Sequence, residues 1–204
     1  MPAEERASRR RRGTPSKGDL REQAILDAAE ALLDERGVDE LTVEEIARGA
    51  GITRGALYFY FGSKQEVLVA LVARTVAALR ETARLAATEG GRDPRDSIRA
   101  ALGTTAAAWR EHGRTMRVAV DHSAVIPEIG AMWVEVLEEN ATALRGVLVR
   151  AGVPDGPGPT DAAERARALC WMTERTFYRA TATGKSLDAA LETCDFLWRS
   201  ALPA

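Results

Sequence analysis

The chain has 204 residues, of which 46% are hydrophobic and 28% charged, and its formal net charge is -2. These proportions exclude disorder of the whole chain, and the length allows one large domain or a small domain joined to a medium one. The first residues carry charges but lack the apolar segment of a secretory signal, and no uncharged apolar run approaches the roughly 18 residues of a membrane span. We therefore expect a cytoplasmic protein.

Basic residues are concentrated near the N-terminus. They are Arg6, Arg9, Arg10, Arg11, Arg12, Lys17 and Arg21. We predict that residues 1–18 form a disordered basic arm, and two interpretations of this arm stay open. It is either a solvated tail without a partner or a segment that binds the phosphates of a nucleic acid.

Three helix starts are indicated by pairs of residues with the spacing of a capping box, in which the first side chain accepts hydrogen bonds from free N–H groups of the first turn. The pairs are Asp19 with Glu22, Thr42 with Glu45, and Ser63 with Glu66. The first pair precedes an apolar pattern of helical spacing that stops before Gly37, which predicts a helix over residues 20–36. A short helix over residues 43–49, a turn at 50–52 and a helix opening at Thr53 then predict a helix-turn-helix, and residues 19–66 form a three-helix unit.

The stretch TRGALYFYFGSK, residues 53–64, contains five consecutive large apolar or aromatic residues. On a helix, five consecutive positions sweep a full turn, so these side chains cannot all face one core. We predict that Leu57 and Phe61 pack on the preceding helix and that Arg54, Tyr58 and Phe59 face outward. An outward face of this kind suits the phosphate-lined groove of DNA, and the alternative is that every ring lies in the core or under another helix.

Residues 67–204 are also predicted to be helical. Helices are expected over residues 64–87, 93–111, 114–123, 127–151 and 161–184 and from residue 186 onward, with Asp161 and Glu164 capping the fifth of them. The loop GVPDGPGP, residues 152–159, is too rich in glycine and proline for regular structure. No alternating strand pattern occurs, so the predicted fold class is all-α with about nine helices.

The segment ILDAAEALLDERGVDELTVEEIARGAGITRGALYFYFGSKQEVLVALV covers about a quarter of the chain and resembles the TetR family of one-component transcriptional regulators. The shared features are the helix start at Thr42, the turn at Gly51, the pair Leu57 and Tyr58, and Ser63 followed by Lys64. The resemblance implies a homodimer with an N-terminal DNA-binding unit. It also implies that residues 67–204 bind an effector and form the dimer through the last two helices.

The same resemblance implies roles for individual residues on DNA. Arg54, Gly55 and Ala56 match positions that approach base edges, whereas Tyr58 and Tyr60 match positions that touch the backbone or the groove wall. The predicted DNA-binding residues are Thr42, Thr53, Arg54, Gly55, Ala56, Tyr58, Tyr60 and Lys64, of which Thr42 and Lys64 match phosphate contacts. Glu44 departs from this pattern, because a carboxylate does not favour contact with DNA.

The tryptophans of the C-terminal part lie on four different predicted helices. They are Trp109, Trp133, Trp171 and Trp198, and they either fill a core or dimer interface or converge on a ligand pocket. The segments ALCWMTERTFY and EIGAMWVEVLEEN are similar to the EthR-type subgroup of the family, which implies a mostly apolar tunnel. The ligand-binding residues implied in this way are Leu102, Trp109, Trp133, Leu137, Leu144, Val147, Thr173, Phe177, Tyr178 and Trp198. The expected effector is a small hydrophobic or amphipathic molecule with one or two polar groups. Glu174 and Arg175 are predicted to be a structural ion pair or helix-surface charges rather than ligand contacts.

Catalysis is not indicated by the sequence. His112 and His122 each follow an acidic residue, but no third ligand occurs at a fixed spacing, so we expect no metal and no cofactor. Cys170 and Cys194 lie in apolar helical segments and are predicted to be buried thiols.

The function expected from the sequence is a repressor that binds an inverted-repeat operator as a dimer and is released by a small effector. Two alternatives stay open. One is a ligand-responsive activator, and the other is a helical protein that binds a small molecule but no specific DNA.

Overall fold

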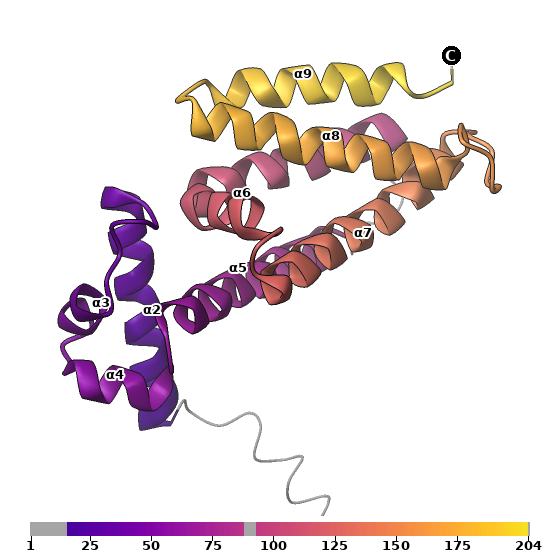
Figure 1. The fold of residues 1–204 in the computed structure, drawn as a ribbon. Coiled ribbons are helices and arrows are strands. Elements are labelled where there is room, and N and C mark those ends of the chain that lie inside the picture. The colour runs from indigo at the N-terminus through magenta and orange to yellow at the C-terminus, as the bar shows by residue number, and fades with distance from the viewer. Residues whose placement is uncertain (1–15, 88–92, 204) are drawn as a thin grey trace, which may run out of the picture. The chain divides into compact units, whose positions relative to one another are not determined.

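The structure is a computed structural model, which describes residues 16–87 and 93–203. Within these ranges the chain forms eight helices and no strand (Figure 1). The helices are α2 (Lys17–Arg36), α3 (Val43–Gly49), α4 (Arg54–Tyr60), α5 (Lys64–Ala87), α6 (Pro94–His122), α7 (Pro127–Arg150), α8 (Ala162–Ala182) and α9 (Leu187–Ser200). The predicted all-α class is confirmed. Residues 1–15 of the predicted disordered arm lie outside the described residues, and the prediction of disorder was wrong at residues 16–18, which form the cap and first turn of α2.

The count of eight helices, instead of about nine, has a local cause. The two helices predicted over residues 93–111 and 114–123 are one helix, α6, which is interrupted only by the non-helical backbone of His112. Asp93 caps this helix and Pro94 occupies its first turn, as the sequence predicts. None of the helices in the described part of the chain is sufficiently long and apolar to span a membrane.

The start of α2 differs from the prediction. The Ser16 hydroxyl accepts a hydrogen bond from the Asp19 N–H at 3.1 Å, and the Asp19 carboxylate accepts one from the Ser16 N–H at 2.9 Å. Ser16 and Asp19 therefore form the capping box, and the helix begins at Lys17. The predicted pair of Asp19 with Glu22 was wrong, because Asp19 already acts as the third helical residue.

The caps of the next two helices agree with the sequence. Thr42 accepts a hydrogen bond from the Glu45 N–H at 3.3 Å, and Thr53 accepts one from the Ala56 N–H at 3.1 Å. Both helices consequently begin where the sequence predicts, at Val43 and Arg54. Asp161 is the N-cap residue of α8, as predicted, but the predicted side-chain cap was wrong, since its carboxylate accepts a hydrogen bond from the Gly158 N–H of the preceding loop and none from the helix.

The described chain divides into two compact units, Met1–Val67 and Leu68–Ala204. The core of the first unit is formed by apolar side chains of α2, α3 and α4 and the segments beside them. Its buried members are Ile25, Leu26, Ala29, Leu33, Leu41, Ile46, Ala47, Leu57, Phe61 and Val67.

The second unit is a bundle in which α6 contacts α7, α8 and α9, and α8 contacts both α7 and α9. Figure 1 shows α8 and α9 as antiparallel neighbours. Trp109, Trp133 and Trp198 are buried in this bundle, whereas Trp171 is 37% exposed. The tryptophans therefore do not all converge on one interior volume.

Cys170 and Cys194 are free and buried, which confirms the prediction of buried thiols. Burial raises the pKa of the Cys170 thiol to about 12 and also raises that of Cys194. Both thiols are protonated and unreactive at neutral pH, because the thiolate is the reactive form.

The turn between α6 and α7 brings two backbone segments into contact at Gly130. A Cβ atom at this position would overlap the carbonyl oxygen of Ser123, which is part of the backbone. Only glycine fits here without moving the turn, so Gly130 fixes how α7 leaves α6.

We predict that Gly130→Ala destabilises the second unit by about 1–3 kcal/mol, because the added methyl group overpacks a backbone contact. The matched control is Gly103→Ala in α6, where a Cβ atom meets nothing within 4 Å. This control should be neutral or stabilising by up to about 1 kcal/mol. Urea unfolding followed by tryptophan fluorescence measures both, since all four tryptophans lie in this unit. Equal stability of the two variants would contradict the prediction.

Candidate functional site

The first candidate site is the exposed face of α4, whose orientation is fixed by two buried side chains. Leu57 is 0% exposed and Phe61 is 7% exposed. The rings between them cannot enter the same core, and Phe59 is accordingly 85% exposed and Tyr58 42% exposed. The prediction of two inward and several outward side chains is thereby confirmed at these positions.

Arg54 is held in place at the start of this face. Its guanidinium group forms an ion pair with Glu44 and donates a hydrogen bond to the Tyr58 hydroxyl at 3.3 Å. The same group lies 5.5 Å from the centroid of the Tyr58 ring, within the range of a cation–π contact. The hydrogen bond to Tyr58 and then the charge of Glu44 raise the pKa of Arg54, so this donor stays positively charged.

Glu44 is the unpredicted part of this arrangement. The sequence showed only that its carboxylate was unusual beside DNA, whereas the structure directs it to Arg54 across the turn between α3 and α4. The ion pair is exposed, because the two side chains retain 60% and 55% of their accessible surface. It therefore orients the guanidinium group more than it stabilises the fold.

An open depression of about 640 Å³ lies along this face. Its lining includes three arginines and one carboxylate, so its charge is mainly positive. The lining residues are Arg21, Glu44, Ala47, Arg48, Gly51, Ile52, Thr53, Arg54 and Ala56. Arg48 was not predicted as a site residue, because nothing in its local sequence separates it from an ordinary surface arginine. Arg21 was noted only as a member of the basic N-terminal stretch.

The other predicted DNA-binding residues are placed around this face. Thr42 and Thr53 are helix caps, Gly55 is exposed, and Ala56 and Tyr60 are half-buried. The Tyr60 ring meets the edge of Phe59, with the two ring centroids 5.3 Å apart.

Lys64 has a structural contact as well as a positive charge. Its ammonium group donates a hydrogen bond to the backbone oxygen of Val38 at 3.2 Å. This bond ties the first residue of α5 to the loop between α2 and α3. Two of the three ammonium protons remain for other acceptors.

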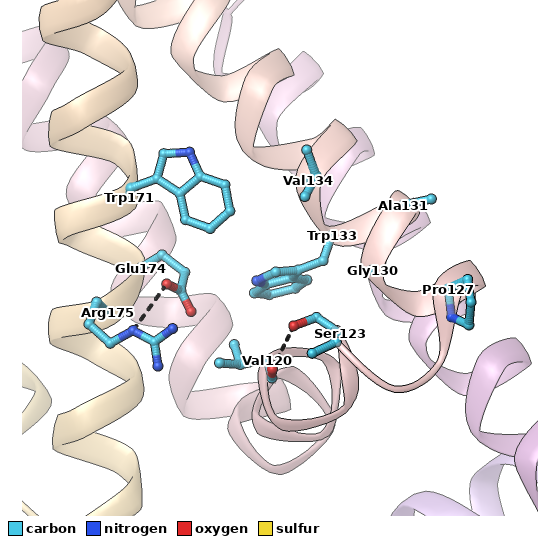
Figure 2. A pocket seen from close by; sticks show the side chains of 11 residues that line it. Val120, Ser123, Pro127, Gly130, Ala131, Trp133, Val134, Trp171, Glu174 and Arg175 are labelled. Atoms are coloured by element: carbon cyan, nitrogen blue, oxygen red, sulfur yellow. Dashed lines mark hydrogen bonds and ion pairs between the residues drawn. The ribbon is translucent and has the colours of Figure 1, made fainter.

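The second candidate site is a cavity of about 310 Å³ in the unit Leu68–Ala204, shown in Figure 2. The end of α6, the first turns of α7 and the middle of α8 form its wall. The lining residues are Val120, Ser123, Ala124, Pro127, Gly130, Ala131, Trp133, Val134, Trp171, Glu174 and Arg175.

Glu174 is the polar group that distinguishes this cavity. It is 4% exposed, and neither of its carboxylate oxygens has a hydrogen-bond partner. The Arg175 Nε atom lies 3.8 Å from one of these oxygens, which confirms the predicted ion pair at a separation too long for a hydrogen bond. Burial raises the pKa of Glu174, and the charge of Arg175 and the indole N–H of Trp133 oppose this shift more weakly.

Trp133 is the one predicted ligand-binding residue that lines this cavity. Seven of the others are buried in the bundle and two are half-buried. The buried residues are Leu102, Trp109, Leu137, Val147, Thr173, Phe177 and Trp198, and the half-buried ones are Leu144 and Tyr178. The Thr173 hydroxyl already accepts a hydrogen bond from the Trp198 indole at 2.9 Å, and the Tyr178 hydroxyl donates one to Asp121 at 2.5 Å.

In the part of the chain that the structure describes, no group of three or more histidine, cysteine, aspartate or glutamate side chains is arranged to hold a metal ion. His112 lies beside Glu111 at the interruption of α6, with 3.7 Å between its Nε2 atom and a carboxylate oxygen of Glu111.

Two short helices joined by a turn, the second with an exposed face that carries Arg54, define a helix-turn-helix protein. Residues 25–71 match the family described as bacterial regulatory proteins, tetR family. The chain is 33% identical over 176 residues to the HTH-type transcriptional regulator EthR of Mycobacterium tuberculosis, which covers 85% of this chain and 81% of that protein. The protein belongs to the TetR family of transcriptional regulators.

Two further comparisons extend over nearly the whole chain. The EthR regulator of Mycolicibacterium smegmatis is 28% identical over 204 residues, covering 97% of this chain and 93% of that protein. A TetR-like transcriptional regulator from Rhodococcus sp. RHA1 has a similar structure, with a TM-score of 0.68 and 25% sequence identity, covering 92% of this chain and 98% of the other. The similarity to EthR-type regulators is thus not limited to the helix-turn-helix.

We predict that Glu44→Gln raises the affinity for DNA of any sequence, because the exposed face of α4 loses a negative charge. It should also lower the ratio of specific to nonspecific affinity about two- to tenfold, since Arg54 loses the partner that orients it. Fluorescence anisotropy with the DNA upstream of the gene and with a scrambled duplex measures both effects. Glu40→Gln removes another exposed carboxylate, which forms no ion pair with Arg54, and should leave the ratio unchanged. An unchanged ratio in Glu44→Gln would show that Glu44 does not position Arg54.

We predict that Glu174→Gln stabilises the protein at pH 7 by about 1–3 kcal/mol, because it replaces a buried charge that has no hydrogen bond. In the folded state the pKa of Glu174 is raised above its ordinary value of 4.5. The protonated carboxyl group therefore favours folding below pH 4.5, and this stabilisation is lost as the pH rises through the raised pKa. The advantage of the variant should therefore shrink as pH falls towards 4.5. Urea unfolding at pH 4.5 and pH 7, with the exposed-site variant Glu128→Gln as control, measures this difference. Equal unfolding free energies at pH 7 would contradict it.

Proposed function

We propose that this TetR-family regulator is a repressor that binds an inverted-repeat DNA operator as a homodimer and is released by a small effector. The observation that carries the proposal is the exposed face of α4, where a charged and oriented Arg54 stands beside exposed aromatic rings. A helix with this composition suits insertion into the major groove.

Arg54 is the proposed reader of sequence. A guanidinium group can donate two hydrogen bonds to the O6 and N7 atoms of one guanine, which distinguishes this base from the others. Gly55 and Ala56 have small side chains and would let the helix approach the base edges closely. Tyr58 and Tyr60 would contact the groove wall.

Phosphate contacts would position the protein without selecting a sequence. We assign them to Thr42, Thr53 and Lys64, and we add Arg21 and Arg48 because both line the same depression as Arg54. When the logarithm of the binding constant is plotted against the logarithm of the salt concentration, each neutralised phosphate makes the slope more negative by about 0.9. These residues would therefore account for much of the affinity but little of the specificity.

Dimerisation is proposed to use α8 and α9. Phe196 is 69% exposed and Leu197 is 38% exposed on α9, and side chains of this kind favour burial against a second subunit. Two subunits would present two α4 helices to successive major grooves on one side of the DNA. The operator should then consist of two half-sites about 34–36 Å apart.

The effector is proposed to act through α5. This helix begins at Lys64 in the first unit and continues to Ala87 in the second, so it connects the two units covalently. A ligand that displaces α5 would change the separation of the two α4 helices in the dimer. By linkage, the effector and the operator would then weaken each other's binding by the same factor, typically about 5- to 150-fold.

The central test is a fluorescence-anisotropy titration of the protein with the DNA upstream of its gene and with a scrambled duplex, at several salt concentrations. We expect tighter binding to the first duplex and a loss of about 5- to 150-fold of this preference in Arg54→Ala. Arg48→Ala is the matched control, since it removes the same charge from the same depression and should weaken binding to both duplexes equally. A preference that Arg54→Ala leaves intact would contradict the assigned role of Arg54.

A further inference from the structure

The cavity described above contains a combination of groups that the fold does not need. Glu174 is buried without a hydrogen-bond partner, and the indole N–H of Trp133 is buried without one as well. Buried polar groups are usually paired, because each unpaired group loses its contacts with water and gains none in return. Two such groups on one cavity wall indicate a place where a ligand completes the contacts.

The positions of Glu174 and Trp133 support the interpretation of the cavity as a ligand site. Figure 2 shows the Glu174 side chain and the Trp133 ring, which come from different helices, bordering the same space. The indole N–H of Trp133 lies close enough to the Glu174 carboxylate to lower the pKa of this group, although the distance and angle between them fall short of a hydrogen bond. A carboxylate has about four acceptor positions, so most of this capacity is open.

The rest of the lining is aromatic or apolar. Trp133 and Trp171 border the cavity from α7 and α8, and Val120, Pro127 and Val134 complete its wall. Trp171 is partly exposed and lies at the rim, whereas Trp133 is buried. The volume of about 310 Å³ falls at the lower end of the range for small-molecule sites.

Arg175 does not neutralise this carboxylate fully. Its Nε atom is 3.8 Å from the nearer oxygen, and its side chain is 55% exposed to solvent. The guanidinium group also lies over the Tyr178 ring, 4.9 Å from the ring centroid. Most of its charge is therefore engaged with water and with Tyr178, which leaves the cavity with an uncompensated acceptor.

We propose that this cavity binds a small amphipathic amine, whose ammonium group donates hydrogen bonds to Glu174 and lies against the faces of Trp133 and Trp171. The apolar part of the ligand would fill the space beside Val120 and Val134. Indole faces attract cations, and a carboxylate is the acceptor that an ammonium group binds most strongly. Binding of the amine does not depend on the function proposed above. Only the role of this ligand as the effector rests on that function.

Other ligand chemistries fit the same wall less well. A fatty acid would place a second negative charge beside the buried Glu174. An alcohol could donate one hydrogen bond to the carboxylate, but it would gain nothing from the charge or from the indole faces. The order of affinity expected for ligands of equal chain length is therefore amine, alcohol and acid.

The test is isothermal titration calorimetry of the full chain at pH 7 without DNA, using n-octylamine, octan-1-ol and octanoate. An alkylamine is protonated at this pH, because its pKa is close to the value of about 10.4 for lysine. We expect octylamine to bind at least about tenfold more tightly than octan-1-ol. Glu174→Gln should remove this preference while changing the affinity for octan-1-ol little.

The control is Glu128→Gln, which removes an exposed carboxylate from the same turn of α7 that contributes Pro127. It should leave the preference for octylamine intact, which separates a specific partner from general attraction to an acidic surface. Equal binding of octylamine and octan-1-ol, tighter binding of octanoate, no binding of octylamine, or an unchanged preference in Glu174→Gln would each overturn the proposal. Because no DNA is present, none of these outcomes bears on sequence-specific binding, and a failure to bind the operator would not alter this titration.

Discussion

The burial of Leu57 and Phe61 determines which side of α4 faces solvent. A helix of seven residues is not stable alone in water, so α4 depends on this packing and on its cap at Thr53. Once these two side chains are in the core, the geometry of a helix turns Arg54 and Phe59 outward. The exposed face of α4 is therefore a consequence of core packing, and a change that loosened the core would also disturb the placement of Arg54.

The charged groups of the two candidate sites differ in their exposure to solvent. Arg54 and Glu44 form an exposed pair, in which water screens both charges and the benefit lies in orientation. Glu174 is buried, and its nearest cation is too distant for a hydrogen bond. A buried carboxylate without a hydrogen bond lowers the stability of the fold, and unpaired buried groups of this kind are typical of binding sites.

The sequence predicted best those features that depend on neighbouring residues. The caps at Thr42 and Thr53 lie within three residues of the N–H groups that they accept from, so the starts of α3 and α4 followed from local pattern. The start of α2 was missed because Ser16 satisfies the same capping rule three residues before Asp19. The single helix α6 was missed because one non-helical residue, His112, does not end a helix.

The contacts that define the sites were harder to predict because they join different helices. Glu44 and Arg54 are ten residues apart and meet across a turn, and the composition of neither helix indicates this pairing. The burial of Glu174 depends on Trp133 and the start of α7, about forty residues earlier in the chain. In the sequence of α8, Glu174 is followed directly by Arg175, so an ordinary ion pair was predicted. The sequence of one helix does not show which other helices cover a side chain.

The measurement that tests the central claim most directly is a selection of bound duplexes from a random-sequence pool, carried out in parallel with the natural protein and with Arg54→Ala. The account predicts that the natural protein enriches an inverted repeat with a guanine at one symmetric position in each half-site. Arg54→Ala should lose the preference at that position and keep the rest of the repeat. Enrichment of no motif by the natural protein, or of an identical motif by both proteins, would contradict the account.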